Sequence, residues 1–217
     1  MTSKWKSLLK EELSKPYLRD ISNFVSKARE TKNIYPASVN VLRVLDLDYD
    51  DVKVVIIGQD PYPTAGDADG LAFSASNSIT VPKSLKRILQ AVEETVEGAA
   101  LVQDPDLFRW HKQGVFLLNT VLTVEEAKPL SHSKIGWQSF TGYIVKLLSL
   151  KENMIFVLWG KEAQNFAMPL LQPDSHVIIA EHPVAGVYDG NRPWLHNDCF
   201  NQVNAILKSY GKREIEW

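Results

Sequence analysis

The sequence contains almost no cysteine: Cys199 is the only one among 217 residues. One thiol excludes a disulfide framework and any zinc site built on several cysteines, and it fits a reducing compartment. Cys199 itself has two interpretations, a reactive thiol or a small packing residue beside Phe200, and we favour the second.

The sequence also lacks long apolar runs. None approaches the roughly 20 residues that a membrane-spanning helix needs. The N-terminal stretch MTSKWKSLLKEEL has no uninterrupted apolar region of the kind found in signal peptides, and Glu11 and Glu12 argue against a mitochondrial transit peptide. We therefore expect no membrane association and a cytoplasmic location, or a nuclear or host-cell one if the source is eukaryotic or viral.

The sequence also has no large excess of basic or of acidic residues. The 24 basic and 26 acidic residues give a formal net charge of −2, so the molecule as a whole is no polycation. Any binding to nucleic acid must then rely on a local basic face. One group of residues is a candidate for such a face: Lys83, Lys86, Arg87, Lys134 and Arg192. An ordinary solvated surface is an equally good interpretation of these side chains.

What the sequence does contain is a series of short apolar runs rich in Val and Ile. They cover residues 52–58, 114–123, 153–160 and 175–181. Continuous apolar runs of this length are typical of strands that are covered on both faces. Segments with helical spacing of apolar residues alternate with them or precede them, at 5–13, 17–30, 84–96, 137–150, 162–171 and 200–210.

This alternation predicts the fold class and the domain organisation. Strands that alternate with helices favour an α/β fold, with a central four-stranded parallel sheet and helices on both faces. The length, together with the absence of an internal repeat or a long Pro/Gly/Ser linker, predicts a single domain over residues 1–217. Residues 1–35 are predicted to form a helical N-terminal lead-in.

The ends of the predicted strands carry a group of polar and aromatic side chains. In open parallel sheets, ligands bind beyond the carboxyl ends of the strands. Gln59, Asp60 and Tyr62 follow the first run, Asn119 lies within the second, and His182 follows the fourth. We therefore expect one site where a carboxylate, an amide, an imidazole and an aromatic ring come together.

Asp60 lies in the string GQDPYP, residues 58–63. Each proline fixes its own φ and restricts the residue before it, Asp60 or Tyr62, to an extended conformation, which holds the carboxylate rigidly at a strand end. A group so placed is suited to orient a water molecule or to meet a developing positive charge. The alternative for an isolated Asp-Pro pair is an ordinary turn with no chemistry.

Asn119 interrupts an apolar run, so its amide needs hydrogen-bond partners. It either bonds neighbouring backbone or reads the edge of a planar ligand. An amide that donates to one carbonyl and accepts from one ring N–H matches uracil rather than cytosine. His182 is either a solvated or capping loop histidine or a donor to a second carbonyl, and Phe73 is either a core residue or a stacking surface for a base.

Around these residues the sequence resembles the family of uracil-DNA glycosylases that includes bacterial, nuclear and herpesvirus enzymes. The resemblance runs over roughly residues 40–205. GQDPYP resembles the family's water-activating loop GQDPYH, and GLAFS follows at the family's spacing. The next segments also follow the family: VPKSL resembles the proline-serine loop, GVFLLNTVLTV the uracil-binding strand, and SHSKIGWQSFT the segment after it. Two further family segments follow in the same order along the chain, WGKEAQ and EHP.

The resemblance implies a function and a catalytic pair. It implies a monofunctional uracil-DNA glycosylase of base excision repair, which hydrolyses the N-glycosidic bond of flipped-out deoxyuridine and needs no metal or cofactor. Asp60 would position the attacking water and stabilise the sugar cation. His182, kept neutral, and the Gln59 backbone would bind uracil O2, and His182 would stabilise the departing uracil anion.

The same resemblance assigns the recognition of the base. Asn119 would read the uracil edge, Phe73 would stack on the ring, and Tyr62 would fill the space that a thymine methyl needs. Two other functions stay open at this point. One is a DNA-binding or polymerase-associated protein with weak or dispensable catalysis, and the other is a glycosylase for a different damaged base.

The sequence departs from the family pattern in the loops that contact DNA. The family's HPSPLSAYRG is HPVAGVYDG here, at residues 182–190, which is one residue shorter and lacks the wedge leucine. Pro63 replaces a histidine, and Lys83 replaces a proline. We expect DNA contacts from a set of residues in the two loops: Pro82, Lys83, Ser84, Val184, Ala185, Gly186, Val187 and Tyr188.

The altered loop leads to expectations about partners, which include single- and double-stranded DNA that contains uracil. Either Val187 or Tyr188 takes over the wedge role, or there is no wedge and single-stranded DNA is favoured. Trp194 either stacks on DNA or packs within the longer segment that follows. A proteinaceous inhibitor that grips the wedge leucine should bind weakly. The loop is also similar to that of the poxvirus branch of the family, whose members serve as polymerase processivity subunits as well. A replication partner is therefore an open alternative. We expect the protein to be a monomer.

Overall fold

The structure, a computed structural model, describes residues 1–76, 78–97, 104–185, 194 and 197–217. At its centre lies a four-stranded parallel sheet in the order β3-β2-β5-β6. The strands are β2 (Val54–Gly58), β3 (Val115–Asn119), β5 (Ile155–Trp159) and β6 (His176–Ala180). The predicted α/β class and the four-stranded parallel sheet are confirmed, and each strand lies inside one of the four apolar runs.

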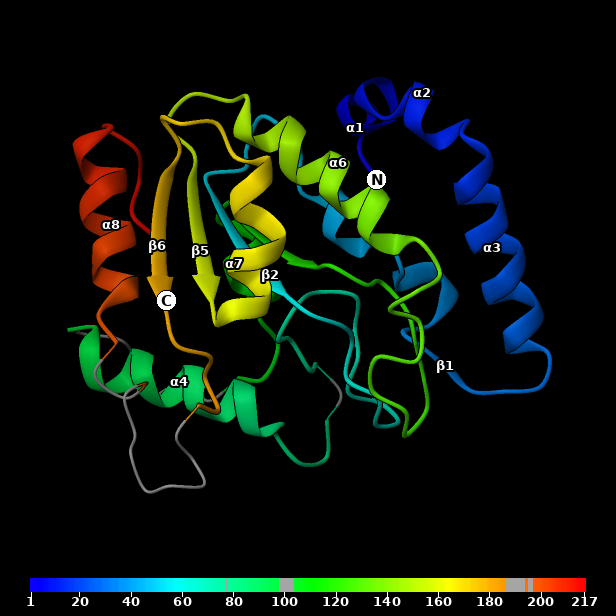
Figure 1. The fold of residues 1–217 in the computed structure, drawn as a ribbon. Coiled ribbons are helices and arrows are strands. Elements are labelled where there is room, and N and C mark those ends of the chain that lie inside the picture. The colour runs from blue at the N-terminus through cyan, green and yellow to red at the C-terminus, as the bar shows by residue number, and fades with distance from the viewer. Residues whose placement is uncertain (77, 98–103, 186–193, 195–196) are drawn as a thin grey trace.

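Helices surround this sheet (Figure 1). They are α1 (Ser3–Leu8), α2 (Lys10–Leu13), α3 (Pro16–Arg29), α4 (Lys83–Thr95), α5 (Phe108–Lys112), α6 (Trp137–Ser149), α7 (Lys161–Ala167) and α8 (Cys199–Ser209), with 3-10 turns at Ser38–Asn40, Arg43–Asp46 and Met168–Leu170. The predicted helix at 162–171 ends early, because Pro169 in its last turn cannot continue an α-helix. No helix in the described part of the chain is long and apolar enough to span a membrane.

Three short elements among the α-helices and strands were not predicted. They are α5 and an antiparallel pair of two-residue strands, β1 (Ile34–Tyr35) and β4 (Val124–Glu125). The prediction of a helical lead-in over residues 1–35 is therefore wrong at its end, since the last helix there stops at Arg29. Two residues carry no periodic pattern of their own, so β1 exists only because a distant segment pairs with it.

Burial differs among the four parallel strands. Every residue of β2, β3 and β5 is buried, as expected for strands that are covered on both faces. The same expectation is wrong for β6, where only Ile178 is fully buried and Ile179 is 55% exposed. β6 is the edge strand of the sheet, so part of its surface faces solvent.

The strand order fixes where a ligand can bind. β2 is followed in sequence by β3 on one side, and β5 pairs on its other side, so the order reverses at β2. In such sheets the crevice beyond the carboxyl ends at this point is the usual ligand site. Figure 1 shows the arrowheads of β5 and β6 pointing to the lower edge of the molecule, where α4 lies.

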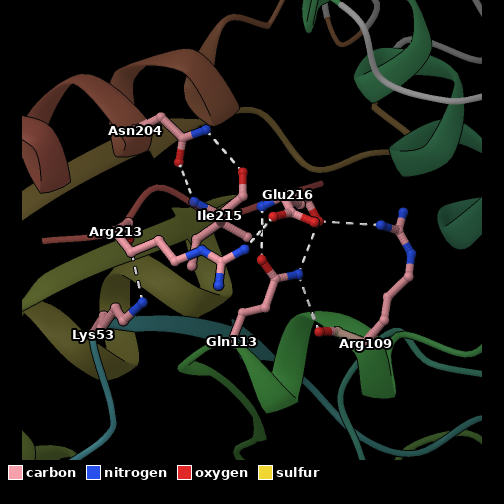
Figure 2. Close-up of polar contacts among 7 residues, drawn as sticks. All are labelled: Lys53, Arg109, Gln113, Asn204, Arg213, Ile215 and Glu216. Atoms are coloured by element: carbon pink, nitrogen blue, oxygen red, sulfur yellow. Dashed lines mark hydrogen bonds and ion pairs between the residues drawn. The ribbon is translucent and has the colours of Figure 1, made fainter.

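The opposite edge of the sheet is closed by the segment after α8 (Figure 2). The Asn204 amide exchanges hydrogen bonds with both backbone groups of Ile215, at 2.9 and 2.8 Å. The Gln113 amide does the same with Glu216, whose carbonyl also accepts from Arg109. These contacts lie at the amino ends of the strands, away from the predicted site, so they serve the fold.

Candidate active site

A small cavity opens at the carboxyl ends of the strands, where the sequence predicts a site. Its volume is about 180 Å³, below the roughly 300–1,000 Å³ of pockets for drug-sized ligands, so it suits one small ring. Every residue predicted for catalysis or base binding lines it: Gln59, Asp60, Tyr62, Phe73, Asn119 and His182. A larger cavity of about 830 Å³ beside α6 and α7 shares only Gln59 with this set, so chemistry rather than size identifies the site.

The Asn119 amide reaches this cavity because Gly58 leaves room for it. The two residues pair in register at the ends of β3 and β2. A Cβ atom on residue 58 would lie 2.3 Å from Asn119 Oδ1, which excludes any residue but glycine. Asn119 is 7% exposed, and no hydrogen bond links its amide to another residue of the described chain. A buried amide without a partner at a cavity wall favours the ligand-reading interpretation over bonding to neighbouring backbone.

The Asp60 carboxylate is half-buried and accepts a hydrogen bond from the backbone. The N–H of Leu130 donates to Asp60 Oδ2 at 2.7 Å. Burial raises the pKa of Asp60 above its ordinary value, and this hydrogen bond partly opposes the rise. Leu130 has a φ of 62°, a conformation that is rare for residues other than glycine and that recurs at functional sites. Nothing in the sequence points to Leu130, because a contact through the main chain does not depend on the residue type.

His182 is held in one neutral form. Burial lowers the pKa of its imidazole, which keeps the ring uncharged at neutral pH. The backbone N–H of Val184 donates to His182 Nδ1 at 3.3 Å, so the proton of the neutral ring resides on Nε2, which is left to donate. Gly160 is needed beside it, since a Cβ there would lie 2.9 Å from His182 Cβ.

A hydrogen bond connects the two aromatic residues that are predicted for the base pocket. The Tyr62 hydroxyl donates to the Phe73 carbonyl at 3.1 Å. The Phe73 ring packs at 5.3 Å from the Trp159 ring and 6.4 Å from the His182 ring, measured between centroids. Phe73 has a φ of 65°, so its backbone is strained at the position where the ring lines the cavity.

A buried carboxylate fixes the loop that carries Phe73. Asp69 is 3% exposed and accepts hydrogen bonds from the Leu71 N–H at 3.0 Å and the Ser74 hydroxyl at 2.6 Å. The Arg43 guanidinium pairs with the same carboxylate at 3.2 Å. Asp69 was not predicted as a functional residue, although its place just before GLAFS is a signal in the sequence, since a carboxylate beside glycine often anchors a turn.

The residues predicted to contact DNA are only partly described. Lys83 is exposed at the start of α4, Ser84 lines the cavity, and Val184 and Ala185 follow His182 in half-exposed positions. The Ala185 N–H donates to the His182 carbonyl at 2.8 Å. Pro82, half-exposed, is the N-cap of α4. The predictions for Gly186, Val187, Tyr188 and Arg192 lie outside the described residues.

Two alternatives that the sequence left open are resolved by packing. Trp194 is 2% exposed, its ring meets the Trp159 ring edge-on at 5.0 Å, and its indole N–H donates to the Arg87 carbonyl at 2.9 Å. Trp194 therefore packs and does not stack on DNA. Cys199 is 1% exposed, and burial raises its pKa to about 12, so the thiol is a packing group.

Within the described residues, no three His, Cys, Asp or Glu side chains lie close enough together to hold a metal ion. The cavity instead offers a carboxylate, a neutral imidazole that donates, an amide with both edges free and an aromatic ring. Such a set can bind one planar ring with two hydrogen-bonding edges and place a carboxylate beside it. The fold and the site thus define an α/β protein with a single-base pocket at the carboxyl edge of its sheet.

Comparison with known families gives the class a name. A family model, the uracil DNA glycosylase superfamily, matches residues 46–208, and the chain belongs to this superfamily. A uracil-DNA glycosylase of Flavobacterium johnsoniae is 40% identical over 220 residues, covering all of this chain and 98% of that protein. One of Borrelia turicatae is 38% identical, covering 98% of this chain and 96% of that protein.

Solved structures agree with this placement. The crystal structure of mimivirus uracil-DNA glycosylase superimposes with a TM-score of 0.90 at 26% identity, covering all of this chain and 87% of that one. The Y322L variant of the same viral protein, solved in complex with UGI, also gives 0.90 at 26% identity over the whole of this chain and 88% of that one.

Proposed function

We propose that the chain hydrolyses the N-glycosidic bond of deoxyuridine in DNA through the six residues around this cavity. As a uracil-DNA glycosylase it releases uracil, and its role is base excision repair. The observation that carries the assignment of roles is that Asp60, Asn119 and His182, from three different strand ends, line one cavity of about 180 Å³. To enter such a pocket, the uracil of a duplex must flip out of the base stack, at a cost of a few kcal/mol.

Recognition of uracil rests on two groups in this proposal. The Asn119 amide donates to uracil O4 and accepts from N3–H, a pattern that cytosine reverses. Its unpartnered state in the described chain supports this role. Tyr62, fixed through its hydroxyl to the Phe73 carbonyl, occupies the space next to C5 and rejects the methyl group of thymine. Phe73 supplies the stacking face.

The Asp60 carboxylate and the His182 imidazole have different roles in the cleavage of the bond. Asp60 stabilises the positive charge that develops on the sugar as the bond between C1′ and N1 breaks. It also orients a water molecule whose oxygen bonds to C1′, and its carboxylate accepts the proton that this water gives up. The uracil leaves with the electron pair as an anion, and His182 Nε2–H donates to its O2 together with the backbone N–H of Gln59. A donor of this kind, preorganised in a site with little water, is worth roughly 3–4 kcal/mol.

The Asp60→Asn variant tests this assignment. It keeps the side-chain shape but cannot accept a proton from water, so uracil release should fall by a factor of about 10³ or more, while DNA binding persists or improves. The measurement is release of uracil from matched single-stranded and duplex oligonucleotides with one dU, in the presence of EDTA. A variant that retains wild-type activity would remove Asp60 from the mechanism.

The finer expectations about partners belong to this proposal. DNA that contains uracil, single- or double-stranded, is the partner. In the loop HPVAGVYDG, which lacks the wedge leucine, either Val187 or Tyr188 takes over the wedge role, or there is no wedge and single-stranded DNA is favoured. Because a mimivirus relative forms a complex with UGI, a protein inhibitor of this kind is a candidate ligand here, with weak binding expected from the same loop. We further propose a monomer in the cytoplasm, or in the nucleus or host cell if the source is eukaryotic or viral, and leave a replication partner as the alternative.

A further inference from the structure

A second cavity, which we call the flanking cavity, lies between α4 and the turn that precedes it. Its volume is about 330 Å³, and its lining consists of Ile79, Thr80, Val81, Lys86, Leu89 and Gln90. The lining combines three aliphatic side chains with one hydroxyl, one ammonium and one amide, and it contains no carboxylate. Such a surface suits a ligand that has an apolar face, a hydrogen-bonding edge and a negative charge, which is the chemistry of a nucleotide.

The flanking cavity adjoins the site already described. Ser84 lines the uracil cavity, and Val81, three residues earlier, lines the flanking cavity. Three residues of chain span at most about 10 Å, and a DNA strand rises about 3.4 Å per stacked nucleotide. A strand whose uracil fills the first cavity therefore brings one of its next few nucleotides to the second. Figure 1 shows α4 and the turn before it along the edge to which the strands point.

We propose that the flanking cavity binds one neighbouring nucleotide of the substrate strand, within three positions of the deoxyuridine. The proposal rests on the proposed function, because it assigns a second subsite to the same DNA strand. Ile79 is fully exposed, at 103% of its reference area, and the Ser78 hydroxyl holds the turn beneath it by donating to the Thr80 carbonyl at 2.6 Å. A base that packs on Ile79 and Val81 removes this apolar surface from water.

The polar members of the lining match the rest of a nucleotide. Gln90 Oε1 accepts from the Arg87 guanidinium at 3.4 Å, and no hydrogen bond within the described chain uses the Gln90 NH₂ group, which is left to donate to a base carbonyl. Lys86 is exposed and forms no ion pair with a described residue, so its ammonium is available to a phosphate. A base enters this cavity only when it is unstacked, and a single strand provides that state at lower cost than a duplex.

The test is a coupling experiment between side chain and base. Single-stranded nonamers with a central dU carry an abasic spacer at one of the three positions on either side, so that a base is removed while its phosphate stays. With the wild type, the spacer should lower kcat/KM for uracil release at one position by roughly fivefold to tenfold. In Ile79→Ala and in Gln90→Ala the intact nonamer should lose activity by a similar factor, and the spacer at that position should have no further effect.

Val39→Ala is the matched control, since Val39 is another aliphatic side chain exposed at 88%, in the 3-10 turn after β1. It should leave both the intact-nonamer rate and the spacer effect at wild-type values. Spacer effects that are the same in Ile79→Ala, Gln90→Ala and wild type at all six positions would overturn the flanking subsite. They would not contradict the proposed glycosylase activity, because uracil release from the intact nonamer by the wild type tests that function separately.

Discussion

Glycine positions the two polar groups that face the base. Gly58 and Gly160 stand where a Cβ would collide with Asn119 and His182 respectively, so the amide and the imidazole occupy space that any other residue would take. Burial at the same sites shifts two pKa values in opposite directions: it raises that of Asp60 and lowers that of His182. Each shift favours the uncharged form, and the reaction needs the imidazole neutral but the carboxylate ionised.

The pH dependence of uracil release follows from these shifts. Asp60 acts as a carboxylate, so kcat/KM should rise with pH through the pKa of Asp60 and then level off, with a midpoint above the ordinary value of about 3.9. The lowered pKa of His182 keeps that ring neutral over the plateau. The profile of His182→Gln is the control: its rate should be lower throughout, but the acid limb should stay. Disappearance of the limb in this variant would assign it to His182.

The raised pKa of Asp60 also has a cost for folding. A carboxyl group whose pKa is higher in the folded state than in the unfolded state stabilises the fold below its unfolded pKa, and this contribution is lost as the pH rises through the folded pKa. Asp60→Asn should therefore melt higher than the wild type at neutral pH, and the difference should vanish near pH 3. Equal melting temperatures at both pH values would mean that burial of Asp60 carries no such cost.

The loop from Asp69 to Ser76 shows how one buried charge holds a functional element. Its carboxylate accepts from the Leu71 N–H, the Ser74 hydroxyl and the Ser76 N–H, while Arg43 pairs with it from outside the loop. The Ser74 hydroxyl oxygen in turn accepts from the Leu107 N–H at 3.0 Å, which ties the loop to the start of α5. Phe73 lies inside this loop with a strained backbone, so the network keeps its ring at the cavity.

We predict that Asp69→Asn destabilises the protein and impairs binding of the base. Hydrogen bonds to a charged group contribute roughly 1.5–3 kcal/mol, and for a chain of this size each kcal/mol corresponds to about 2–4 °C in Tm. The variant should melt about 3–12 °C lower and show a raised KM at temperatures where it is still folded. Ser74→Ala, which removes one of the bonds, should have a smaller effect on both. An unchanged KM in a folded Asp69→Asn would separate the network from the position of Phe73.

The elements divide clearly into those that the sequence predicts and those that it does not. The strands β2, β3 and β5 were predictable because both of their faces are buried, which leaves continuous apolar runs. Gln59, Asp60, Tyr62 and Asn119 were predictable as site residues because they stand at or just after the ends of the β2 and β3 runs, and His182 because it follows the β6 run. Phe73 stands at no strand end and was identified from the segment GLAFS. β1, in contrast, depends on pairing with a segment far away in sequence, and the contact from the Leu130 N–H to Asp60 uses only backbone. Neither leaves a local pattern, so only the folded chain reveals them.

At the scale of the whole molecule, an acidic protein has to bind a polyanion. The net charge of −2 gives no general attraction to DNA, so the attraction must come from a local face. Lys83, Lys86 and Arg87 lie within the first two turns of α4, at the edge where the strands end, and that helix has no acidic residue in its first turn. Cations at the start of a helix oppose its dipole, so they do not serve the stability of α4.

The salt dependence of DNA binding tests whether this face contacts phosphates. Each phosphate neutralised on a single strand adds about 0.7 to the slope of log K against log[salt]. In an Asp60→Asn background, which prevents turnover, Lys83→Ala should weaken binding of a single-stranded oligonucleotide and reduce the magnitude of the slope by about 0.7. Lys10→Ala, an exposed lysine of α2 far from this edge, should change neither value. If Lys83→Ala and Lys10→Ala give the same slope as the parent, the lysine at the start of α4 is an ordinary solvated side chain, and the chain binds DNA by contacts within the uracil cavity and its loops.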